Sequence, residues 1–350
     1  MPSLTANVAI VVLHYGDVRD TCRCLDSLER LHSVSHQVVV VDNGSSPAAS
    51  SEIVRRYSRI HVIRRESNGG WAGGNNTGIR YALEQGAEHV VLLNNDTTVA
   101  PHLLHAILQA ARGAPEFGIL GPVISFMDEP DQVRTDGCMF AEPGRNGFFH
   151  RREVPLNAAG SPTITEVDIV NGCCMMVDAR VLRAVGFIDE RFFLVHEESD
   201  LCLRAWRAGF RCGIVGEPLV WHKGSRSFET TGKPVQRYYD ARNLFLLLRK
   251  HSSKLRNRVP YALPGSWRWH LEYLKHVYYR YCVERDAGRD ETAQAVLEGI
   301  WDACTGCYGP YVQRKRPGVR SLRWLFECWR RRRFQFVVTR LSGSSGCPTA

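Results

Sequence analysis

The sequence predicts an α/β fold built on a doubly wound, mostly parallel sheet, and two observations support that class. Four short, β-branched and nearly continuous apolar segments suit parallel strands buried on both faces, at residues 7–13, 36–42, 60–65 and 88–93. Helix-like segments alternate with them, at about 18–31, 49–58, 75–85 and 101–112. Such alternation is the pattern of a parallel sheet with helices on both faces.

The later elements are less regular. Residues 117–178 are strand-rich, with prolines and glycines that indicate hairpins and a long loop near 141–165. Two more helices are predicted at about 199–208 and 235–250. The closing LSGSSGCPTA reads as a disordered tail. We therefore expect an α/β domain over 1–251, a basic, aromatic-rich helical extension over 252–340 and a tail over 341–350.

Charge is distributed unevenly along the chain. With 350 residues and 44% hydrophobic composition, the chain can bury a large core. Residues 251–350 contain 18 Lys and Arg against 8 Asp and Glu, a net charge of +10, whereas residues 1–250 carry a net charge of −1. The first part has the balance of an ordinary enzyme, and the last hundred residues carry the whole excess.

Several classes of protein are disfavoured by composition. No apolar run approaches the roughly 18 residues that span a bilayer. The apolar opening VAIVVLHYG lacks a basic leader and a cleavage site, so it reads as a strand and we expect a cytoplasmic protein. The 12 cysteines form no regular framework and show no zinc-site spacing, so we expect them to be mostly reduced.

Polar residues follow each of the four predicted strands. In doubly wound sheets, ligands bind beyond the carboxyl ends of the strands. Here those ends carry His14-Tyr15-Gly16, Asp42-Asn43-Gly44-Ser45, Glu66-Ser67-Asn68-Gly69-Gly70 and Asn94-Asn95-Asp96. The sequence therefore predicts a binding site along this edge of the sheet.

Two of these strand ends offer groups for a nucleotide. Asp42, in VVVVDNGSS, can accept hydrogen bonds from a nucleoside base or ribose, or it can simply close an Asx turn. The glycine-rich NGGWAGGNNTG, residues 68–78, lacks the lysine of a Walker loop. Backbone N–H groups at a helix N-terminus attract phosphate, and the amides of Asn68, Asn75 and Asn76 favour a polar ligand there.

Two other residues are candidate metal ligands. Asp96 ends VVLLNND, and a diphosphate held with Mg²⁺ or Mn²⁺ uses one or two carboxylates while the phosphates supply further oxygens. The alternative for Asp96 is a turn residue that caps the next helix. His222, in PLVWHKG, follows another apolar stretch, and a single histidine in such a place is more often structural.

Three carboxylates crowd together before the helix predicted at 199–208. They are Glu197, Glu198 and Asp200, in FFLVHEESD. Like charges at this spacing should raise at least one pKa, which suits a general base. The alternative is that acids in a first helical turn only complement the helix dipole.

The order of these motifs resembles glycosyltransferase family 2, with its GT-A fold, and is most similar to its bacterial rhamnosyltransferase and galactofuranosyltransferase branch. Seven stretches between about residues 7 and 251 carry the resemblance: VVLHYG, VVVVDNGSS, NGGWAGGNNTGI, VVLLNNDTTV, GFIDERFFLVHEESDLCLRAWRAGF, VWHKGS and YYDARNLFLLLRKH. The resemblance implies an inverting transfer of a sugar from a nucleotide-diphosphate donor, with dTDP-rhamnose as one candidate. The acceptor would be a saccharide or lipid-linked saccharide in cell-surface polysaccharide biosynthesis.

The resemblance also implies which residues bind the donor. Asp42 would hold the nucleoside, and Asn68 with the glycine-rich stretch would line the diphosphate and sugar. Arg242 and Asn243 match an RN pair that lies near the donor phosphates in some members. The donor-binding candidates are Tyr15, Asp42, Asn43, Asn68, Gly70, Trp71, Asn75, Asn94, Asn95, Arg242 and Asn243.

The resemblance also implies which residues bind the metal ion and which one acts as the general base. Asp96 matches the last acid of the family's Asp-x-Asp signature, and His222 matches a histidine that completes the metal site in some relatives. Asn94 stands where the first acid often lies, so fewer charges would hold Mg²⁺ or Mn²⁺. Glu198 falls where the family commonly has its base, with Glu197 and Asp200 as alternatives.

The basic C-terminal region has two interpretations. In SLRWLFECWRRRRFQFVV, Leu322, Leu325 and Trp329 fall at helical spacing, and Arg330 to Arg333 follow. Such a helix suits an anionic membrane surface, such as the inner face of the plasma membrane. Alternatively, it packs on the catalytic domain, with its arginines in solvent. Nucleic acid is not an expected partner, because no nucleic-acid motif accompanies the basic residues.

Two other functions are weighed against the transferase. A degenerate transferase would keep donor affinity and act as an assembly partner, and the missing first acid favours it. A dinucleotide-dependent oxidoreductase is disfavoured, because the first strand–helix turn, LHYGDVRD, lacks the Gly-x-Gly-x-x-Gly fingerprint.

Overall fold

The computed structural model describes most of the chain, and the described residues are 7–32, 34–135, 137–140, 149–151, 154–156, 163–223, 234–251, 268–312 and 314–331. The chain divides into two compact units. Unit 1 comprises Met1–Met139, Arg151–Glu190 and Glu197–Gly224. Unit 2 comprises Phe140–His150, Arg191–His196 and Ser225–Ala350. Most of the predicted loop near 141–165 and the predicted tail at 341–350 lie outside the described residues.

The strands are β1 (Val8–His14), β2 (His36–Asp42), β3 (His61–Arg64), β4 (His89–Asn94), β5 (Thr97–Val99), β6 (Phe117–Phe126), β7 (Val133–Thr135), β8 (Cys138–Phe140), β9 (Phe149–Arg151), β10 (Ile164–Val167), β11 (Cys174–Asp178) and β12 (Arg211–His222). The helices are α1 (Val18–Leu28), α2 (Pro47–Arg56), α3 (Gly70–Glu84), α4 (Leu103–Gly113), α5 (Ala179–Val185), α6 (Glu197–Arg207), α8 (Pro234–His251), α9 (Arg268–Asp286), α10 (Asp290–Thr305) and α11 (Val319–Arg331).

The main sheet confirms the predicted fold class. Its strands run in the order β10-β12-β6-β11-β4-β1-β2-β3. The pairs β4–β1, β1–β2, β2–β3 and β6–β12 are parallel, and β11 runs antiparallel between β4 and β6. All seven residues of β1 are buried, which explains why its sequence is a continuous apolar run without alternation.

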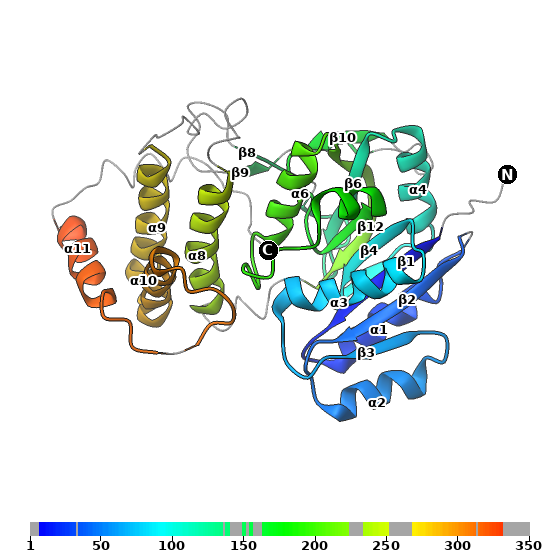
Figure 1. Cartoon of the computed structure of the whole chain (residues 1–350), viewed down its shortest axis with the longest axis horizontal. Coiled ribbons are helices and arrows are strands. Elements are labelled where there is room, and N and C mark those ends of the chain that lie inside the picture. The colour runs from blue at the N-terminus through cyan, green and yellow to red at the C-terminus, as the bar shows by residue number, and fades with distance from the viewer. Residues whose placement is uncertain are drawn as a thin grey trace. The chain divides into compact units, whose positions relative to one another are not determined.

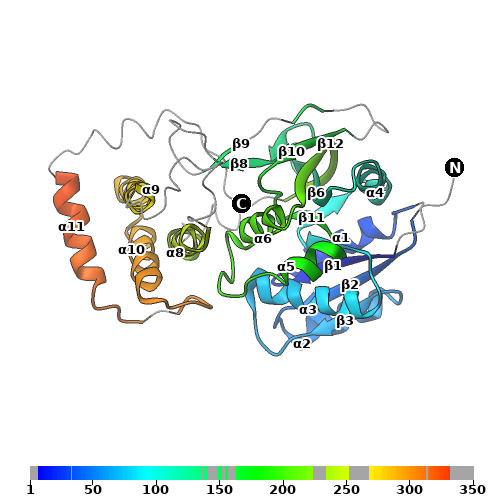
Figure 2. The same ribbon diagram turned by 45° about the horizontal axis from the view of Figure 1, so that its top comes forward.

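Helices cover both faces of this sheet within unit 1 (Figures 1 and 2). Ile10 and Val12 of β1 share one apolar core with Leu25 of α1 and Ile107 of α4. On the opposite face, α3 packs against the alternate side chains of β1. This two-sided burial leaves only the strand ends for polar residues, so the carboxyl edge becomes the place where a site can form.

The start of α3 corrects one prediction. A glycine-rich loop ahead of a helix at residue 75 was expected, but α3 begins at Gly70 and contains most of these glycines. A Cβ on Gly74 would lie 2.3 Å from Leu13 Cδ1, and one on Gly78 would lie 2.3 Å from Val11 Cγ1. The glycines at 74 and 78 therefore bring the helix close to β1, and this contact compensates for their poor helix propensity.

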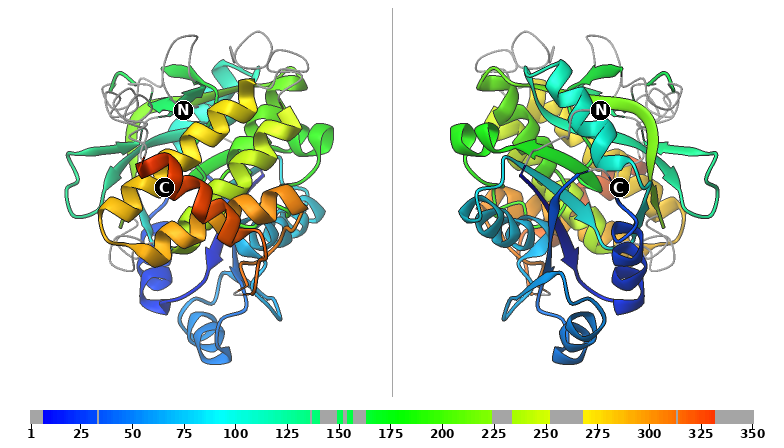
Figure 3. Two further views of the ribbon diagram at one scale, coloured as in Figure 1. Left: turned by 90° about the vertical axis from the view of Figure 1, so that its left-hand side faces the viewer. Right: turned by 90° about the vertical axis from the view of Figure 1, so that its right-hand side faces the viewer.

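Unit 2 is helical in its described part. Helices α8, α9 and α10 pack side by side, and α11 lies against α10 (Figure 3). Their shared core includes Leu244, Val277, Tyr281, Leu297 and Phe326. The predicted helix at 235–250 is confirmed as α8.

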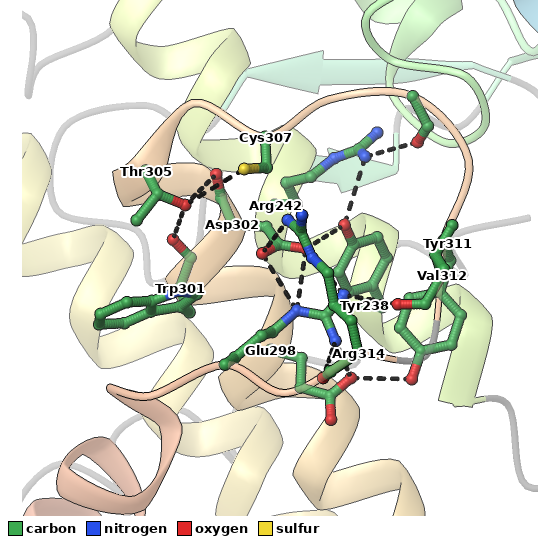
Figure 4. Close-up of polar contacts among 12 residues, drawn as sticks. Tyr238, Arg242, Glu298, Trp301, Asp302, Thr305, Cys307, Tyr311, Val312 and Arg314 are labelled. Carbon is green, nitrogen blue, oxygen red and sulfur yellow. Dashed lines mark hydrogen bonds and ion pairs between the residues drawn. The ribbon is translucent and has the colours of Figure 1, made fainter.

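A buried ion-pair cluster fixes the segment after α10 (Figure 4). Arg316 is 7% exposed and donates to both carboxylate oxygens of Asp302 and to Glu298. Asp302 is 1% exposed and also accepts from Tyr238 of α8 at 2.7 Å. Every charge in this cluster has an opposite partner, as burial of charge requires.

Helix α11 packs through the three residues that gave its helical spacing, but on the other helices of unit 2 and not on the catalytic domain. Leu322, Leu325 and Trp329 pack against the apolar core of unit 2. Trp324 lies on the exposed side, with 70% of its surface accessible. Arg332 and Arg333 fall outside the described residues. None of the helices in the described part of the chain is long and apolar enough to cross a bilayer.

Candidate active site

The carboxyl ends of β1, β2 and β4 meet along one edge of the sheet. His14 pairs in register with Asp42, and Leu13 pairs with Asn94. Asp42 is 0% exposed and accepts from the Ser45 N–H at 2.7 Å and from the Ser50 hydroxyl. The Asx turn considered from the sequence is therefore present, and a nucleoside contact by Asp42 stays a prediction.

Asn43 ties the end of β2 to the start of α3. Its Nδ2 donates to Asn68 Oδ1 at 2.9 Å and to the Gly70 carbonyl at 3.0 Å. Its Oδ1 accepts from the Gly69 N–H at 3.0 Å. Asn68 Oδ1 also accepts from the Gly70 N–H at 2.7 Å. These bonds place three of the donor-binding candidates in one cluster and orient the first turn of α3.

Trp71 links the first turn of α3 to the end of β4. Its indole N–H donates to Asn94 Oδ1 at 3.0 Å. Asn75 donates to the Trp71 carbonyl at 2.9 Å, while Asn75 Oδ1 is buried and has no hydrogen-bond partner among the described residues. An unpaired buried oxygen costs about 1–3 kcal/mol unless water or a ligand satisfies it. Asn75 is therefore well suited to meet a bound donor.

His14 ends β1 at the same carboxyl edge of the sheet, and the sequence pattern assigned it no role. Its Nδ1 lies 2.7 Å from Thr21 Oγ1, which also accepts from Asn95 Nδ2 at 2.9 Å. The His14 Nε2 is buried without a partner in the described part of the chain. Burial lowers the pKa of His14, so the ring is neutral. Tyr15, the next residue, is 58% exposed and accessible to a ligand.

Asp96 and His222 lie in contact although 126 positions separate them. The Nε2 of His222 is 2.9 Å from Asp96 Oδ1. Antiparallel pairing of β12 with β5 causes this approach, because His222 pairs with Thr97. The Lys223 N–H then donates to the Asp96 carbonyl at 3.0 Å. The predicted meeting of these two residues is confirmed.

The pair offers a partial set of ligands for a divalent ion. One carboxylate and one imidazole suit Mn²⁺, and Mg²⁺ is held by one or two carboxylates with substrate phosphates. Across the described residues, His, Cys, Asp and Glu side chains nowhere gather in groups of three or more that could hold a metal ion. Asn94, at the position of a missing acid, is engaged by Trp71. The residues therefore fit an ion that also receives oxygens from its substrate.

The three clustered carboxylates differ in environment. All three lie in the first turn of α6. Asp200 is 0% exposed and accepts from Arg204 at 2.7 Å, which matches the structural alternative for this residue. Glu197 is 4% exposed, whereas Glu198 is only partly buried. Of the three, Glu198 is the most accessible to solvent.

The pKa of Glu197 is raised, as expected for one of the three carboxylates, but burial contributes more than the crowding. Burial and, secondarily, the charge of Glu198 raise the pKa of Glu197 well above its ordinary value of 4.5. The Oε2 of Glu197 is buried without a hydrogen-bond partner among the described residues. Glu197 therefore favours the protonated form, and this lessens the repulsion that the sequence led us to expect.

Arg242 and Asn243 lie on α8 and are both 0% exposed. Their side chains donate to backbone carbonyls of the segment Arg191–His196, which directly precedes α6. Phe193, Val195 and His196 in this segment have φ of 64°, 73° and 72°. Non-glycine residues pay about 1–2 kcal/mol each for this left-handed conformation. Contact of the pair with donor phosphates stays a prediction.

Comparison with known proteins gives a family model and several relatives. The family model described as "Glycosyl transferase family 2" matches residues 9–185. The chain is 28% identical over 267 residues to the dTDP-rhamnosyl transferase RfbF of Shigella flexneri, covering 74% of this chain and 84% of the relative. It is 26% identical over 311 residues to an N-acetylglucosaminyl-diphospho-decaprenol L-rhamnosyltransferase of Mycobacterium tuberculosis, covering 82% and 97% of the two chains.

A solved structure supports the fold. The crystal structure of S. aureus TarS residues 1–349 in complex with UDP-GlcNAc aligns with a TM-score of 0.53 at 16% sequence identity. The alignment covers 96% of this chain and 91% of that one. At this identity the likeness concerns the arrangement of helices and strands alone.

Proposed function

This chain belongs to glycosyl transferase family 2 and has its GT-A fold, and on that premise we propose that it transfers L-rhamnose from dTDP-rhamnose with inversion at the anomeric carbon. The observation that carries the proposal is the 2.9 Å contact between Asp96 and His222 next to the carboxyl edge of the sheet. Two motifs far apart in sequence thereby converge where a doubly wound sheet binds its ligand. No observation in the described part of the chain favours the degenerate alternative.

The choice of donor and acceptor rests on the relatives. The Shigella flexneri relative is named as a dTDP-rhamnosyl transferase. The Mycobacterium tuberculosis relative is named for transfer of L-rhamnose to an N-acetylglucosaminyl-diphospho-decaprenol. We propose dTDP-rhamnose as donor and a hydroxyl of a lipid-linked saccharide as acceptor, in cell-surface polysaccharide biosynthesis at the cytoplasmic face of the membrane.

In the proposed reaction, Glu198 acts as the general base. Its carboxylate removes the proton from the acceptor hydroxyl, and the oxygen attacks the anomeric carbon from the face opposite the diphosphate. The bond between that carbon and the diphosphate oxygen breaks, and its electron pair leaves with the nucleoside diphosphate. A general base whose pKa lies near the working pH suits this task. The amides around Asn43, Asn68 and Asn75 would orient the donor.

Asp96 and His222 would hold Mg²⁺ or Mn²⁺ together with oxygens of the donor diphosphate. When bound, the ion would neutralise the charge that develops on the leaving group in the transition state. Because two side chains of the described residues would contribute, oxygens of the donor would complete the coordination. We therefore propose that metal and donor bind cooperatively.

The test compares Glu198→Gln with the wild-type protein, in Mn²⁺, for transfer from dTDP-rhamnose and for slow hydrolysis of the donor. Loss of the base should lower kcat by about 10²- to 10⁴-fold, because that is the usual contribution of general base catalysis. Nucleotide binding, followed by thermal shift, should be retained.

Glu29→Gln, at the exposed end of α1, is the matched control and should keep full activity. Turnover of Glu198→Gln equal to wild type would rule out Glu198 as the base. A wild-type protein that binds the donor yet neither transfers nor hydrolyses it would contradict the enzymatic proposal altogether.

A further inference from the structure

The segment Arg191–His196 adopts a backbone that its residues disfavour. Phe193, Val195 and His196 all have positive φ, and none of them is glycine. Val195 is β-branched, which makes this conformation especially unfavourable. The Leu194 N–H donates to the Phe192 carbonyl at 2.7 Å, so the chain reverses over three residues around Phe193. Such a segment keeps its shape only when its surroundings determine it.

Asn243 makes most of the side-chain hydrogen bonds that fix this backbone. Its single Nδ2 group lies 2.8 Å, 2.7 Å and 2.8 Å from the carbonyls of Phe192, Leu194 and Val195. The side chain is 0% exposed, so water does not compete for these carbonyls. One amide therefore gathers three carbonyls that a regular strand or helix would point in different directions.

Arg242 holds Asn243 in the orientation that this requires. Arg242 Nε donates to Asn243 Oδ1 at 2.9 Å, which turns the amide nitrogen toward the segment. Arg242 Nη2 adds a bond to the Phe192 carbonyl at 2.9 Å, and Nη1 donates to the Gly309 carbonyl at 2.7 Å. Figure 4 shows Arg242 beside Tyr238, whose hydroxyl lies 3.4 Å from Arg242 Nη1. The guanidinium is thereby fixed by partners on several segments.

Other residues of α8 contact the same segment. Phe193 stacks on Tyr239, with ring centroids 5.5 Å apart. The Nε2 of His196 lies 3.4 Å from Asp240 Oδ1, and both side chains are at most 5% exposed. One face of α8, over residues 239–243, therefore holds the segment from Phe192 to His196.

We propose that Asn243, oriented by Arg242, is a positioning residue for the catalytic carboxylate. The clamped segment ends at His196, and Glu197 and Glu198 are the next two residues, at the start of α6. The clamp therefore fixes the backbone directly ahead of the two glutamates in the chain. Release of the segment would let the first turn of α6 change direction and move Glu198 away from the acceptor hydroxyl. This inference rests on the proposed function, in which Glu198 is the base.

The central variant is Asn243→Ala, assayed in the full-length protein with Mn²⁺, dTDP-rhamnose and a synthetic lipid-linked saccharide. Its kcat should fall by about 10- to 100-fold, because a shift of about 1 Å in a catalytic group has an effect of this size. Its donor KM and its thermal shift with dTDP should stay within about twofold of wild type, because only the reacting carboxylate is displaced. Amide hydrogen exchange over residues 192–198 should become faster.

Two further variants separate positioning from general stability. Tyr273→Phe removes a buried hydrogen bond to the Ala241 carbonyl of α8 without touching the clamped segment. It should lower Tm and leave kcat within about twofold of wild type. Val195→Gly added to Asn243→Ala should recover at least about threefold in kcat, because glycine adopts positive φ freely. The double variant also serves if Asn243→Ala alone does not fold.

The outcomes distinguish the positioning role of Asn243 from the proposed function. An active wild-type protein whose Asn243→Ala variant retains its kcat would overturn the positioning role and leave the proposed function intact. An equal loss of kcat in Tyr273→Phe would also overturn it, because activity would then follow stability alone. A wild-type protein without transfer or donor hydrolysis would overturn the proposed function itself, and the positioning role with it.

Discussion

Glu197 and Glu198 are neighbours in sequence with different surroundings. The carboxyl of Glu197 is buried, and its pKa is raised well above 4.5, first by burial and then by the charge of Glu198. Glu198 retains partial contact with solvent. The raised pKa favours a proton on Glu197, which lessens the repulsion between the two carboxylates in one helical turn. We interpret Glu197 as the neutral support and Glu198 as the carboxylate that meets the acceptor.

Replacing Glu197 by Gln tests this assignment through the pH dependence of stability. A folded-state pKa above the unfolded value of about 4.5 means that the folded protein binds more protons. The contribution of Glu197 to the wild-type free energy of unfolding should therefore fall as pH rises above about 4.5. The fall should be up to about 1.4 kcal/mol per pH unit until the folded pKa is reached. Glutamine does not titrate, so the Tm of Glu197→Gln relative to wild type should increase between pH 5 and pH 8.

Glu29→Gln is the control for this comparison, because Glu29 is exposed at the end of α1. Its Tm should run parallel to that of wild type across the same pH range. A constant Tm difference between Glu197→Gln and wild type at pH 5 and pH 8 would contradict the raised pKa of Glu197.

At the scale of elements, α3 depends on glycine for its approach to the sheet. Gly74 and Gly78 are one helical turn apart and face Leu13 and Val11 of β1. The first turn of the same helix carries Trp71, which bonds to Asn94 at the end of β4. The spacing between helix and sheet therefore also sets the position of the donor-binding candidates. Packing and site geometry are coupled through this one helix.

Gly78→Ala should destabilise the protein. The new Cβ would lie 2.3 Å from Val11 Cγ1, so either the helix or the strand must move. Overpacking of this kind costs about 1–3 kcal/mol, against a gain of up to about 1 kcal/mol in helix propensity. We expect a net loss of about 1–2 kcal/mol, measured by urea unfolding.

Gly113→Ala is the matched control on α4. A Cβ at Gly113 meets nothing within 4 Å, so only the change in propensity applies. Its stability should rise or stay unchanged, by no more than about 1 kcal/mol. Equal effects of the two substitutions would show that close approach to β1 is not what glycine provides at position 78.

At the scale of the whole molecule, binding of metal and donor should be visible as thermal stability. A ligand that binds only the folded state at 100 times its Kd adds about 2.7 kcal/mol to the free energy of unfolding. Asp96 and His222 reach each other through the pairing of β12 with β5, which joins distant parts of the chain. Ligand binding there should therefore stabilise unit 1 as a unit.

Asp96→Asn should remove the metal-dependent part of this stabilisation. In wild type we expect dTDP-rhamnose with Mn²⁺ to raise Tm more than the sum of the two alone. In the variant the donor should act alone, because an amide replaces the only acidic ligand of the pair. Asp26→Asn, which alters a surface ion pair between Asp26 on α1 and Arg56 on α2, should behave as wild type. Equal Mn²⁺ effects in both variants would exclude Asp96 as a metal ligand.

The sequence by itself determined the parts of this protein that depend on local pattern. Strands β1 to β4, their polar carboxyl ends and helix α8 follow from runs and periods that a few consecutive residues carry. The meeting of Asp96 with His222 also came from the sequence, through the family resemblance of the ordered motifs. Local pattern failed at Gly70, because glycine disfavours helix unless a neighbouring strand makes close approach favourable.

Only the tertiary structure decided which groups are buried and which partner each one has. The sequence placed Glu197, Glu198 and Asp200 in one cluster, but their separate environments depend on contacts made elsewhere in the fold. The resemblance implied that Arg242 and Asn243 lie near the donor phosphates, which stays a prediction, and only the structure shows that both also bond to the backbone ahead of α6. The physical reason is that burial and hydrogen-bond partners are set by residues distant in sequence, and periodicity does not record them.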